Sequence, residues 1–524
     1  MHSSVTFAAA SPVAETAAGK LAGSSNRGVH SFKGVPYGAP TGGSNRFMPP
    51  KKPEPWAGVR SAVDWAGRAP QASASGPRRS ELSGLSGPPD RLTESEDCLT
   101  LNVWTSGLRD GRKRPVMVWY HGGGFSTGSS NMPRLDGSNL AELYDVVVVT
   151  VNQRLNIMGH FHLAEIGGAR FAQSGNAGTL DMVAALQWVK DNAESFGGDP
   201  GNVTIFGQSG GGGKVSALLA TPTARGLFHR AIVMSGTAVR LCTRERASKL
   251  ADAVLKHLEL TPARIEELQT MPFKQLIAAI RPAQKMVGRP EQPLFDRYDF
   301  APVVDGTILP AHPFDPVAPS VSADIPVLVG GTKDEMAGYL APNDKVWNRV
   351  LTEDEMRALI AAVAGGATDE VVALYNRLHP AASPSDRAIS ALTDSNFRLR
   401  GLLLAERKAA LAKAPVWLYS FDWESPVFDG KLKAFHALDV PFVFNTIDYV
   451  NATDRGPVAH ELSRRVSATW AAFARTGNPN NPAIPNWPAY TTGDRATMIF
   501  NRECSVVNDY GSEGRQLWKR IAGA

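Results

Sequence analysis

The chain alternates short apolar runs with stretches of helical periodicity. Four apolar runs fit buried strands: residues 99–104, 116–120, 146–151 and 203–206. Residues 179–194 fit a helix whose apolar positions recur at the spacing of one face: Leu180, Val183, Ala184 and Trp188. Strands separated by helices pair in parallel, because a parallel pair needs a crossover connection. The pattern therefore predicts an α/β fold with a doubly wound sheet.

The second half of the chain continues this pattern with longer helical segments. Further strands are predicted at 231–234, 326–330 and 416–421, and residues 244–280 read as mainly helical. We expect a single domain, residues 1–524, in which an excursion at about 240–290 and the C-terminal helical part cover the pocket. Residues 73–90 are rich in Ser, Gly, Pro and Arg, and this composition predicts a mobile surface loop that flanks the pocket mouth.

Composition excludes several classes of protein. The 524 residues are 43% hydrophobic and 20% charged, so the chain can bury a substantial core and remain soluble. A net charge of +5 over this length gives a weak field, and no nucleic-acid partner is expected. The densest basic run, Arg112-Lys113-Arg114, fits a solvated loop better than a phosphate site.

No membrane span, signal peptide or metal site is expected. The longest apolar run, residues 146–149 with Val151, is too short to cross a bilayer. The N-terminus lacks a basic segment followed by a long apolar one. The three cysteines, Cys98, Cys242 and Cys504, are scattered singly, which fits reduced thiols in a cytoplasmic protein.

The strongest chemical signal is the run Gly207-Gln208-Ser209-Gly210-Gly211. It follows the apolar run 203–206 and opens a helical pattern, which is the strand, tight turn and helix context of a nucleophile elbow. A serine held in a strained turn needs neighbours without side chains. A glycine-rich turn or an anion-binding loop is the alternative, and the context favours the elbow.

A second glycine run, His121-Gly122-Gly123-Gly124-Phe125, follows the apolar run 116–120. Consecutive glycines let two backbone N–H groups point at one spot, as a developing oxyanion requires. Alone this segment would fit a flexible turn. Together with an elbow downstream, it predicts an oxyanion hole.

A nucleophilic serine needs a histidine base, and the base needs an acid to orient it. In α/β-hydrolases these residues occur in the order serine, acid, histidine. Asp334 and Glu335 follow the apolar run 326–330, and either could serve on chemistry alone. Of the downstream histidines, His379 and His460 fit helix positions, whereas a third precedes an apolar stretch in a loop. That residue, His436, is the best candidate base.

The sequence resembles the type B carboxylesterase family, which includes cholinesterases, liver carboxylesterases and bacterial para-nitrobenzyl esterases. The resemblance covers nearly the whole chain and is carried by these blocks: Phe32-Lys33-Gly34-Val35-Pro36-Tyr37, Ser95-Glu96-Asp97-Cys98-Leu99, Phe196-Gly197-Gly198-Asp199-Pro200 with the elbow, and Arg475-Thr476-Gly477-Asn478-Pro479. It implies an α/β-hydrolase fold, with a central, mostly parallel twisted sheet flanked by helices and with helical excursions covering the pocket.

The resemblance also assigns roles to residues. It places the acid on Glu335 and the base on His436, with Ser209 as the nucleophile. The oxyanion donors fall on the N–H groups of Gly123, Gly124 and Gly210. Ser235 matches a serine that supports the acid from behind. No cofactor and no metal are implied.

Two departures from the family pattern change the expectations. The usual partner of the Cys98 position is replaced by Ala69, so Cys98 should be a free thiol. Gln208 stands where cholinesterases and many bacterial members have glutamate. The loss of that carboxylate beside the nucleophile favours neutral over cationic esters.

The sequence therefore predicts a serine hydrolase that acts on a small-molecule ester through an acyl-enzyme intermediate. An amide, carbamate or lactone hydrolase would use the same residues, because leaving-group preference depends on pocket shape. A catalytically silent binding protein is the alternative from another class. The retention of serine, acid, base and both glycine elements argues against it.

Overall fold

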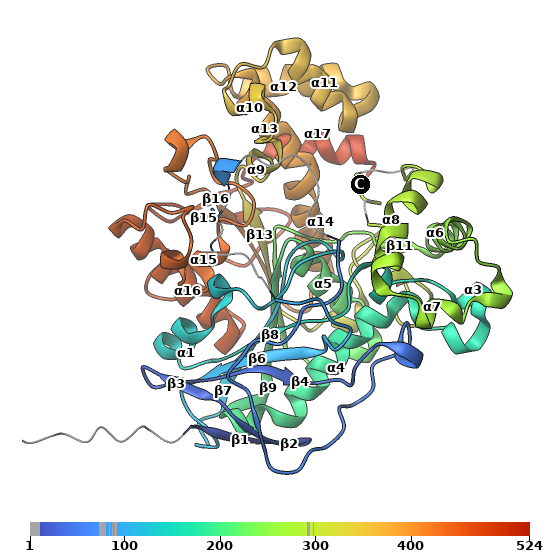
Figure 1. The fold of residues 1–524 in the computed structure, drawn as a ribbon. Helices are drawn as coiled ribbons and strands as arrows, with labels where there is room; N and C mark the ends of the chain where they lie inside the picture. Colours follow the sequence, from blue (N-terminus) through green and yellow to red (C-terminus); the bar gives the residue numbers. More distant parts are fainter. Residues whose placement is uncertain are drawn as a thin grey trace, which may run out of the picture.

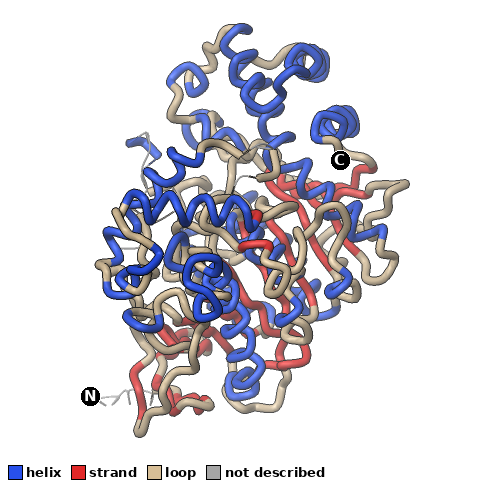
Figure 2. Tube along the Cα trace, turned by 90° about the vertical axis from the view of Figure 1, so that its right-hand side faces the viewer, coloured by secondary structure: helices blue, strands red, loops and turns tan. Residues whose placement is uncertain are grey.

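A computed structural model describes residues 11–72, 80–82, 84–85, 87, 92–290, 294–296 and 298–524. A large twisted sheet crosses the molecule, and helices cover both of its faces (Figure 1, Figure 2). Most of the predicted mobile loop 73–90 lies outside the described residues.

The central sheet has eleven strands among the described residues. Their spatial order is β16 (Ser505–Asn508), β15 (Ala496–Phe500), β14 (Val416–Phe421), β13 (Val327–Thr332), β10 (Arg230–Met234), β9 (Gly198–Gln208), β7 (Arg114–Tyr120), β8 (Val147–Val151), β6 (Thr100–Thr105), β4 (Val29–Pro36) and β3 (Ser24–Asn26). The strands from β15 to β8 pair in parallel, and those at the two edges pair antiparallel. β7 and β8 are buried along their whole length, as expected for parallel strands covered on both faces.

Small sheets lie outside this one. The first joins β1 (Val13–Thr16), β2 (Gly19–Ala22) and β5 (Val59–Ser61), and the second joins β11 (Cys242–Thr243) to β12 (Val303–Val304). The helices, in chain order, are α1 (Ser138–Tyr144), α2 (Asn156–Gly159), α3 (Ala164–Gly167), α4 (Ala177–Asn192), α5 (Gly210–Leu219), α6 (Arg244–His257), α7 (Glu267–Thr270), α8 (Phe273–Val287), α9 (Met336–Leu340), α10 (Asp344–Trp347), α11 (Glu353–Ala364), α12 (Thr368–Leu378), α13 (Pro384–Thr393), α14 (Leu399–Ala410), α15 (Val440–Val443), α16 (Pro457–Thr476) and α17 (Ser512–Ala522).

Helix α4 forms where predicted, but its buried face differs from the predicted one. Leu180, Val183 and Ala184 are only half-buried. The most buried apolar side chains include Met182 and Leu186. The helix is covered on most of its circumference, including polar positions in its first turns, so apolar spacing alone does not mark the face that packs against the sheet.

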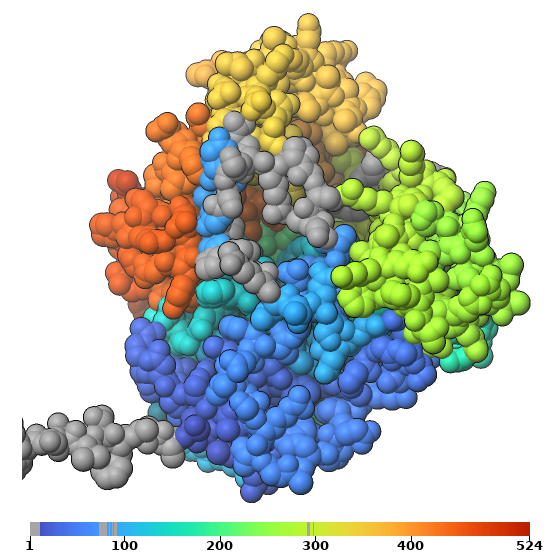
Figure 3. Space-filling view, viewed as in Figure 1, coloured from blue at the N-terminus to red at the C-terminus, as the bar shows by residue number. Residues whose placement is uncertain are grey.

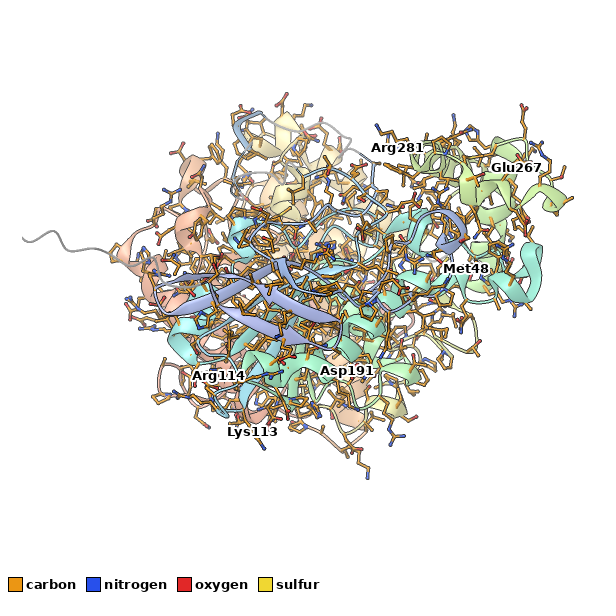
Figure 4. The ribbon with its side chains drawn as sticks, turned by 60° about the horizontal axis from the view of Figure 1, so that its bottom comes forward. Met48, Lys113, Arg114, Asp191, Glu267 and Arg281 are labelled. Atoms are coloured by element: carbon orange, nitrogen blue, oxygen red, sulfur yellow. The ribbon has the colours of Figure 1, made fainter. Side chains whose placement is uncertain are left out.

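The basic run Arg112-Lys113-Arg114 was predicted to be a solvated loop, and for Arg114 this prediction is wrong. Arg114 begins the strand with a side chain only 2% exposed, and it pairs with Asp110 at 2.5 Å and Asp145 at 2.6 Å. Arg112 remains exposed. Figure 4 shows Arg114 beside Lys113 at one end of the molecule, far from the helical region labelled by Glu267 and Arg281. A buried arginine needs carboxylate partners, which this loop and α1's end provide.

The excursion is helical, as expected, and has an apolar cluster of its own. Side chains of α6, α7 and α8, including Leu250, Leu268 and Leu276, pack with Phe47 and Phe161. These helices form the lobe at the right of Figure 1. In the space-filling view, the surface is hollowed between this green lobe and the yellow region of α11 and α12 (Figure 3).

One stretch of the described chain, Glu353–Leu378, is long and apolar enough to cross a membrane by composition, with a mean hydropathy of 1.4. In the structure it is broken into α11 and α12 at Gly365, whose φ is 53°. Met356 and Val371 are fully buried within the protein. The stretch is thus two short helices, each with one buried apolar face, and 33% of its most apolar part is buried within the protein.

Candidate active site

Ser209 occupies the sharp turn between β9 and α5. Its backbone has φ 58° and ψ −126°, a conformation that non-glycine residues rarely adopt. The turn is tightly enclosed: a Cβ atom on Gly210 would lie 2.1 Å from the Gly124 carbonyl oxygen, and one on Gly236 would lie 1.7 Å from that of Ser209. Only glycine fits at these positions, so the predicted strand, turn and helix arrangement has a steric basis.

His436 and Glu335 meet across more than a hundred residues of sequence. His436 Nδ1 lies 2.5 Å from Glu335 Oε2, and the carboxylate is 1% exposed. The other carboxylate oxygen, Oε1, accepts the backbone N–H of Thr332 at 2.9 Å. Since the carboxylate accepts the Nδ1 proton, the Nε2 lone pair of the neutral imidazole is left as an acceptor.

The adjacent carboxylate takes a different position. Asp334 is buried near the backbone of Ala434, whose N–H approaches it at 3.4 Å, and burial raises the pKa of Asp334 to about 6. His379 packs against Tyr375, and His460 pairs with Asp448. Of these acids and histidines, the structure brings only Glu335 and His436 together.

Gln208 contacts the second ring nitrogen of His436, the one that does not contact Glu335. Its side-chain amide donates to His436 Nε2 at 3.2 Å, and the residue is 4% exposed. Ser209 and His436 line the same cavity, but no hydrogen bond joins them. Hydrogen bonds of this kind often tighten only when substrate is bound. Gln208 and Ser209 therefore compete for the same nitrogen.

The glycine run lies directly against the elbow. Gly123 and Gly124 have φ of 94° and 65°, and the backbone of Gly124 borders Gly210 at the start of α5. Several hydrogen bonds that the sequence did not reveal fix this loop: Asn156 donates to Phe125 O at 2.6 Å and to Ser126 O at 3.0 Å, and Lys214 Nζ donates to His121 O at 2.8 Å. These hydrogen bonds and the close packing of Gly124 against Gly210 hold the N–H groups of Gly123, Gly124 and Gly210 in place.

Two buried ionisable groups near the site were not predicted. Lys214 is fully buried in α5, and burial lowers its pKa to about 7. Asp439 accepts the Tyr419 hydroxyl at 3.0 Å, and burial, followed by the charge of Glu335, raises its pKa to about 7. The only hint in the sequence was that a lysine or aspartate interrupts an otherwise small or apolar stretch.

Ser235 was predicted to support the acid. Its backbone N–H donates to Gly330 O at 2.7 Å, but its buried hydroxyl makes no hydrogen bond. The Thr332 N–H, rather than Ser235, donates to the Glu335 carboxylate. The supporting role of Ser235 stays a prediction.

Two cavities meet at Ser209. The larger, of about 900 Å³, includes Gln208 and His436, and the smaller, of about 110 Å³, includes Gly210 and Phe397. The described members of the 73–90 segment in the larger cavity are Leu82, Gly84, Leu85 and Gly87. Among the described residues no cluster of three or more metal-binding side chains occurs, and Cys98 is unpaired as expected.

Comparisons with known proteins agree with this geometry. Residues 10–518 match the model of the family described as "Carboxylesterase family". The para-nitrobenzyl esterase of Bacillus subtilis is 37% identical over 96% of this chain and 98% of its own length, and phenmedipham hydrolase of Pseudarthrobacter oxydans is 34% identical over 95% and 96%. The crystal structure of a Geobacillus stearothermophilus carboxylesterase superposes with a TM-score of 0.82 at 36% identity, covering 97% of this chain and 99% of that one. The chain therefore belongs to the carboxylesterase family and is a serine ester hydrolase of the α/β-hydrolase fold.

Proposed function

We propose that Ser209 is the nucleophile of this hydrolase, with His436 as general base and Glu335 as the residue that orients the base. His436 Nε2 takes the Ser209 proton as the oxygen attacks the ester carbonyl, and the same nitrogen then protonates the leaving alcohol. A water molecule repeats the sequence on the acyl-enzyme. The observation that carries this proposal is the fixed Nδ1 contact with Glu335, on a histidine that shares a cavity with Ser209.

The N–H groups of Gly123, Gly124 and Gly210 are proposed to bind the oxyanion of the tetrahedral intermediate. Their support is position: Gly124 lies against Gly210, and Gly210 is the first residue of α5. Preformed donors at a helix N-terminus need no reorganisation when charge develops, and this makes them effective.

The preferred substrates are proposed to lack a cationic alcohol group. Gln208 gives the site a hydrogen-bond donor without a negative charge. Among the described residues that line the two cavities at Ser209, none is Asp or Glu. A quaternary ammonium group would therefore find no carboxylate partner among these described residues. The proposed location is the cytoplasm, since unpaired cysteines are typical of reducing compartments.

One panel of substrates tests this proposal and its alternatives. We expect p-nitrophenyl esters of increasing acyl length to be hydrolysed, with an initial burst of p-nitrophenol if deacylation is slow. The matching p-nitroanilide and a p-nitrophenyl carbamate should react much more slowly. Ser209→Ala should lose activity by a factor on the order of 10⁴ or more while its melting temperature stays near that of the wild type. Full activity in this variant would refute the assignment of the nucleophile.

A further inference from the structure

The larger cavity at Ser209 contains a cation with no partner among the described residues. Arg134, in the single-turn helix η3 (Pro133–Leu135), lines it together with Ser209 and His436. Its Nε atom is buried without a hydrogen bond, and no ion pair of the described part of the chain includes its guanidinium. Thr446 donates to the Arg134 carbonyl oxygen at 2.7 Å, so the backbone at this position is held in place.

Two fully buried arginines of this protein are paired with carboxylates. Arg154 meets Asp181 at 2.6 Å, and Arg46 meets Glu96 at 2.6 Å. For Arg134, burial alone lowers the pKa, and a guanidinium stays charged at neutral pH in any case. Arg134 is half-buried, and its Nε atom is withdrawn from water without a partner, so a carboxylate that forms two parallel N–H···O bonds is the best partner for this guanidinium. The described lining of this cavity contains no Asp or Glu, so among the described residues Arg134 is left free to meet a carboxylate on a bound molecule.

The chemistry indicates which part of the substrate meets Arg134. The leaving alcohol must lie next to His436, because this residue supplies its proton. Of the two cavities that contain Ser209, only the larger is also lined by His436. The alcohol part therefore occupies the larger cavity, on the side of Arg134, and the acyl part points into the smaller one.

We propose that Arg134 recognises a carboxylate on the alcohol part of the substrate, so that the preferred substrates are esters of carboxylate-bearing alcohols or phenols. This inference rests on the proposed ester hydrolysis at Ser209. It goes further than the preference for neutral esters expected from Gln208. With glutamine at that position, the site has no negative charge there to repel such a substrate.

The test compares 4-(carboxymethyl)phenyl butyrate with 4-(carbamoylmethyl)phenyl butyrate. The two esters share an acyl group and a shape, and the methylene group insulates the phenol from the difference in charge. We expect wild-type kcat/KM to favour the carboxylate by about fivefold or more, a typical effect of one charge-assisted hydrogen-bonded pair. Arg134→Met should bring the ratio of the two kcat/KM values close to 1, and Arg134→Lys should retain part of the preference.

Two variants serve as controls. Arg112→Met removes the same charge from an exposed position outside both cavities and should keep the preference. Arg400→Met removes the arginine that lines the smaller cavity and should also keep it. A wild-type ratio near 1, a ratio unchanged in Arg134→Met, or a loss of preference in either control would overturn the proposal.

A second measurement does not depend on the fold of a variant. In the wild type, 4-hydroxyphenylacetate should inhibit more strongly than 4-hydroxyphenylacetamide, and equal inhibition would contradict the proposal. Hydrolysis of p-nitrophenyl butyrate distinguishes a failure of the proposed ester hydrolysis from a failure of the proposed role of Arg134. If this ester is not hydrolysed, the proposed function fails. If it is hydrolysed without any preference for the carboxylate, only the role of Arg134 fails.

Discussion

Glu335→Gln is the substitution that tests the catalytic arrangement most sharply, because the two neighbours of this carboxylate constrain an amide in opposite ways. Glu335 Oε1 accepts the Thr332 backbone N–H at 2.9 Å, and Oε2 contacts His436 Nδ1 at 2.5 Å. The Thr332 N–H is fixed in its strand and can only donate. A glutamine must therefore turn its oxygen to Thr332 and its NH₂ group to His436.

That orientation reverses the tautomer of the histidine. An NH₂ group facing Nδ1 needs an acceptor there, so the ring proton moves to Nε2, where it blocks removal of the Ser209 proton. The expected loss is about 10⁴ in kcat, which corresponds to about 5 kcal/mol of transition-state stabilisation. Asp334→Asn should change kcat by less than about threefold, because Asp334 lies against the Ala434 backbone and not against His436.

The assay is p-nitrophenyl butyrate hydrolysis across pH, with the melting temperature of each variant measured in parallel. Glu335→Gln should recover some activity at high pH, where hydroxide replaces the missing base. The reasoning would be refuted by an active Glu335→Gln enzyme beside an inactive, folded Asp334→Asn enzyme. It would also fail if Glu335→Gln lost activity only because it no longer folded.

Three further predictions follow from single contacts. Gly210→Ala would place a Cβ atom 2.1 Å from the Gly124 carbonyl oxygen and should lower kcat by about 10² or more, with KM less affected; an unchanged kcat would contradict the assigned oxyanion hole. Burial raises the pKa of Asp439 from 3.8 to about 7, so the folded state binds this proton more tightly than the unfolded state does. The free energy of unfolding should therefore fall as the pH rises from 3.8 to about 7. Asp439→Asn should flatten the dependence of melting temperature on pH between 5 and 8, and an unchanged dependence would contradict this assignment. Butyrylcholine should be no better a substrate than 3,3-dimethylbutyl butyrate, whereas Gln208→Glu should favour the cation at low salt; a wild-type preference of about tenfold for the cation would point to another source of attraction, such as an aromatic face.

The sequence located the parts of the site that depend on local geometry. The elbow at Ser209 could be read from its glycines because the strain and close contacts arise within a few residues. The adjacent carboxylates Asp334 and Glu335 could not be told apart on chemistry alone, because both contact the same loop a hundred residues downstream and differ only in which one meets the His436 ring. The family resemblance favoured Glu335, and its carboxylate is the one that contacts His436 Nδ1; its role as the catalytic acid stays a prediction.

The features that the sequence did not reveal all depend on distant packing. Arg134 is notable because no carboxylate of the described residues pairs with it, and Asp439 because it is buried beside Tyr419 and the charge of Glu335. Arg114 looked like part of a solvated run because one of its two partners, Asp145, lies beyond the end of its own strand and of α1. Burial and pairing of this kind follow from the folded arrangement and leave no periodic trace in the chain.

The three unpaired cysteines also make the protein convenient to label. Burial raises the pKa of the Cys98 and Cys242 thiols well above the ordinary value, and neither side chain is accessible in the folded state. Cys504 is half-buried, lies in the turn between β15 and β16 at the edge of the sheet, and lines neither cavity at Ser209. Burial raises the pKa of the Cys504 thiol too, but its side chain is partly accessible, so a maleimide dye applied to the native protein should attach at this one position, away from the substrate. Such a dye gives a fluorescence probe of unfolding for every variant discussed above, without an engineered cysteine.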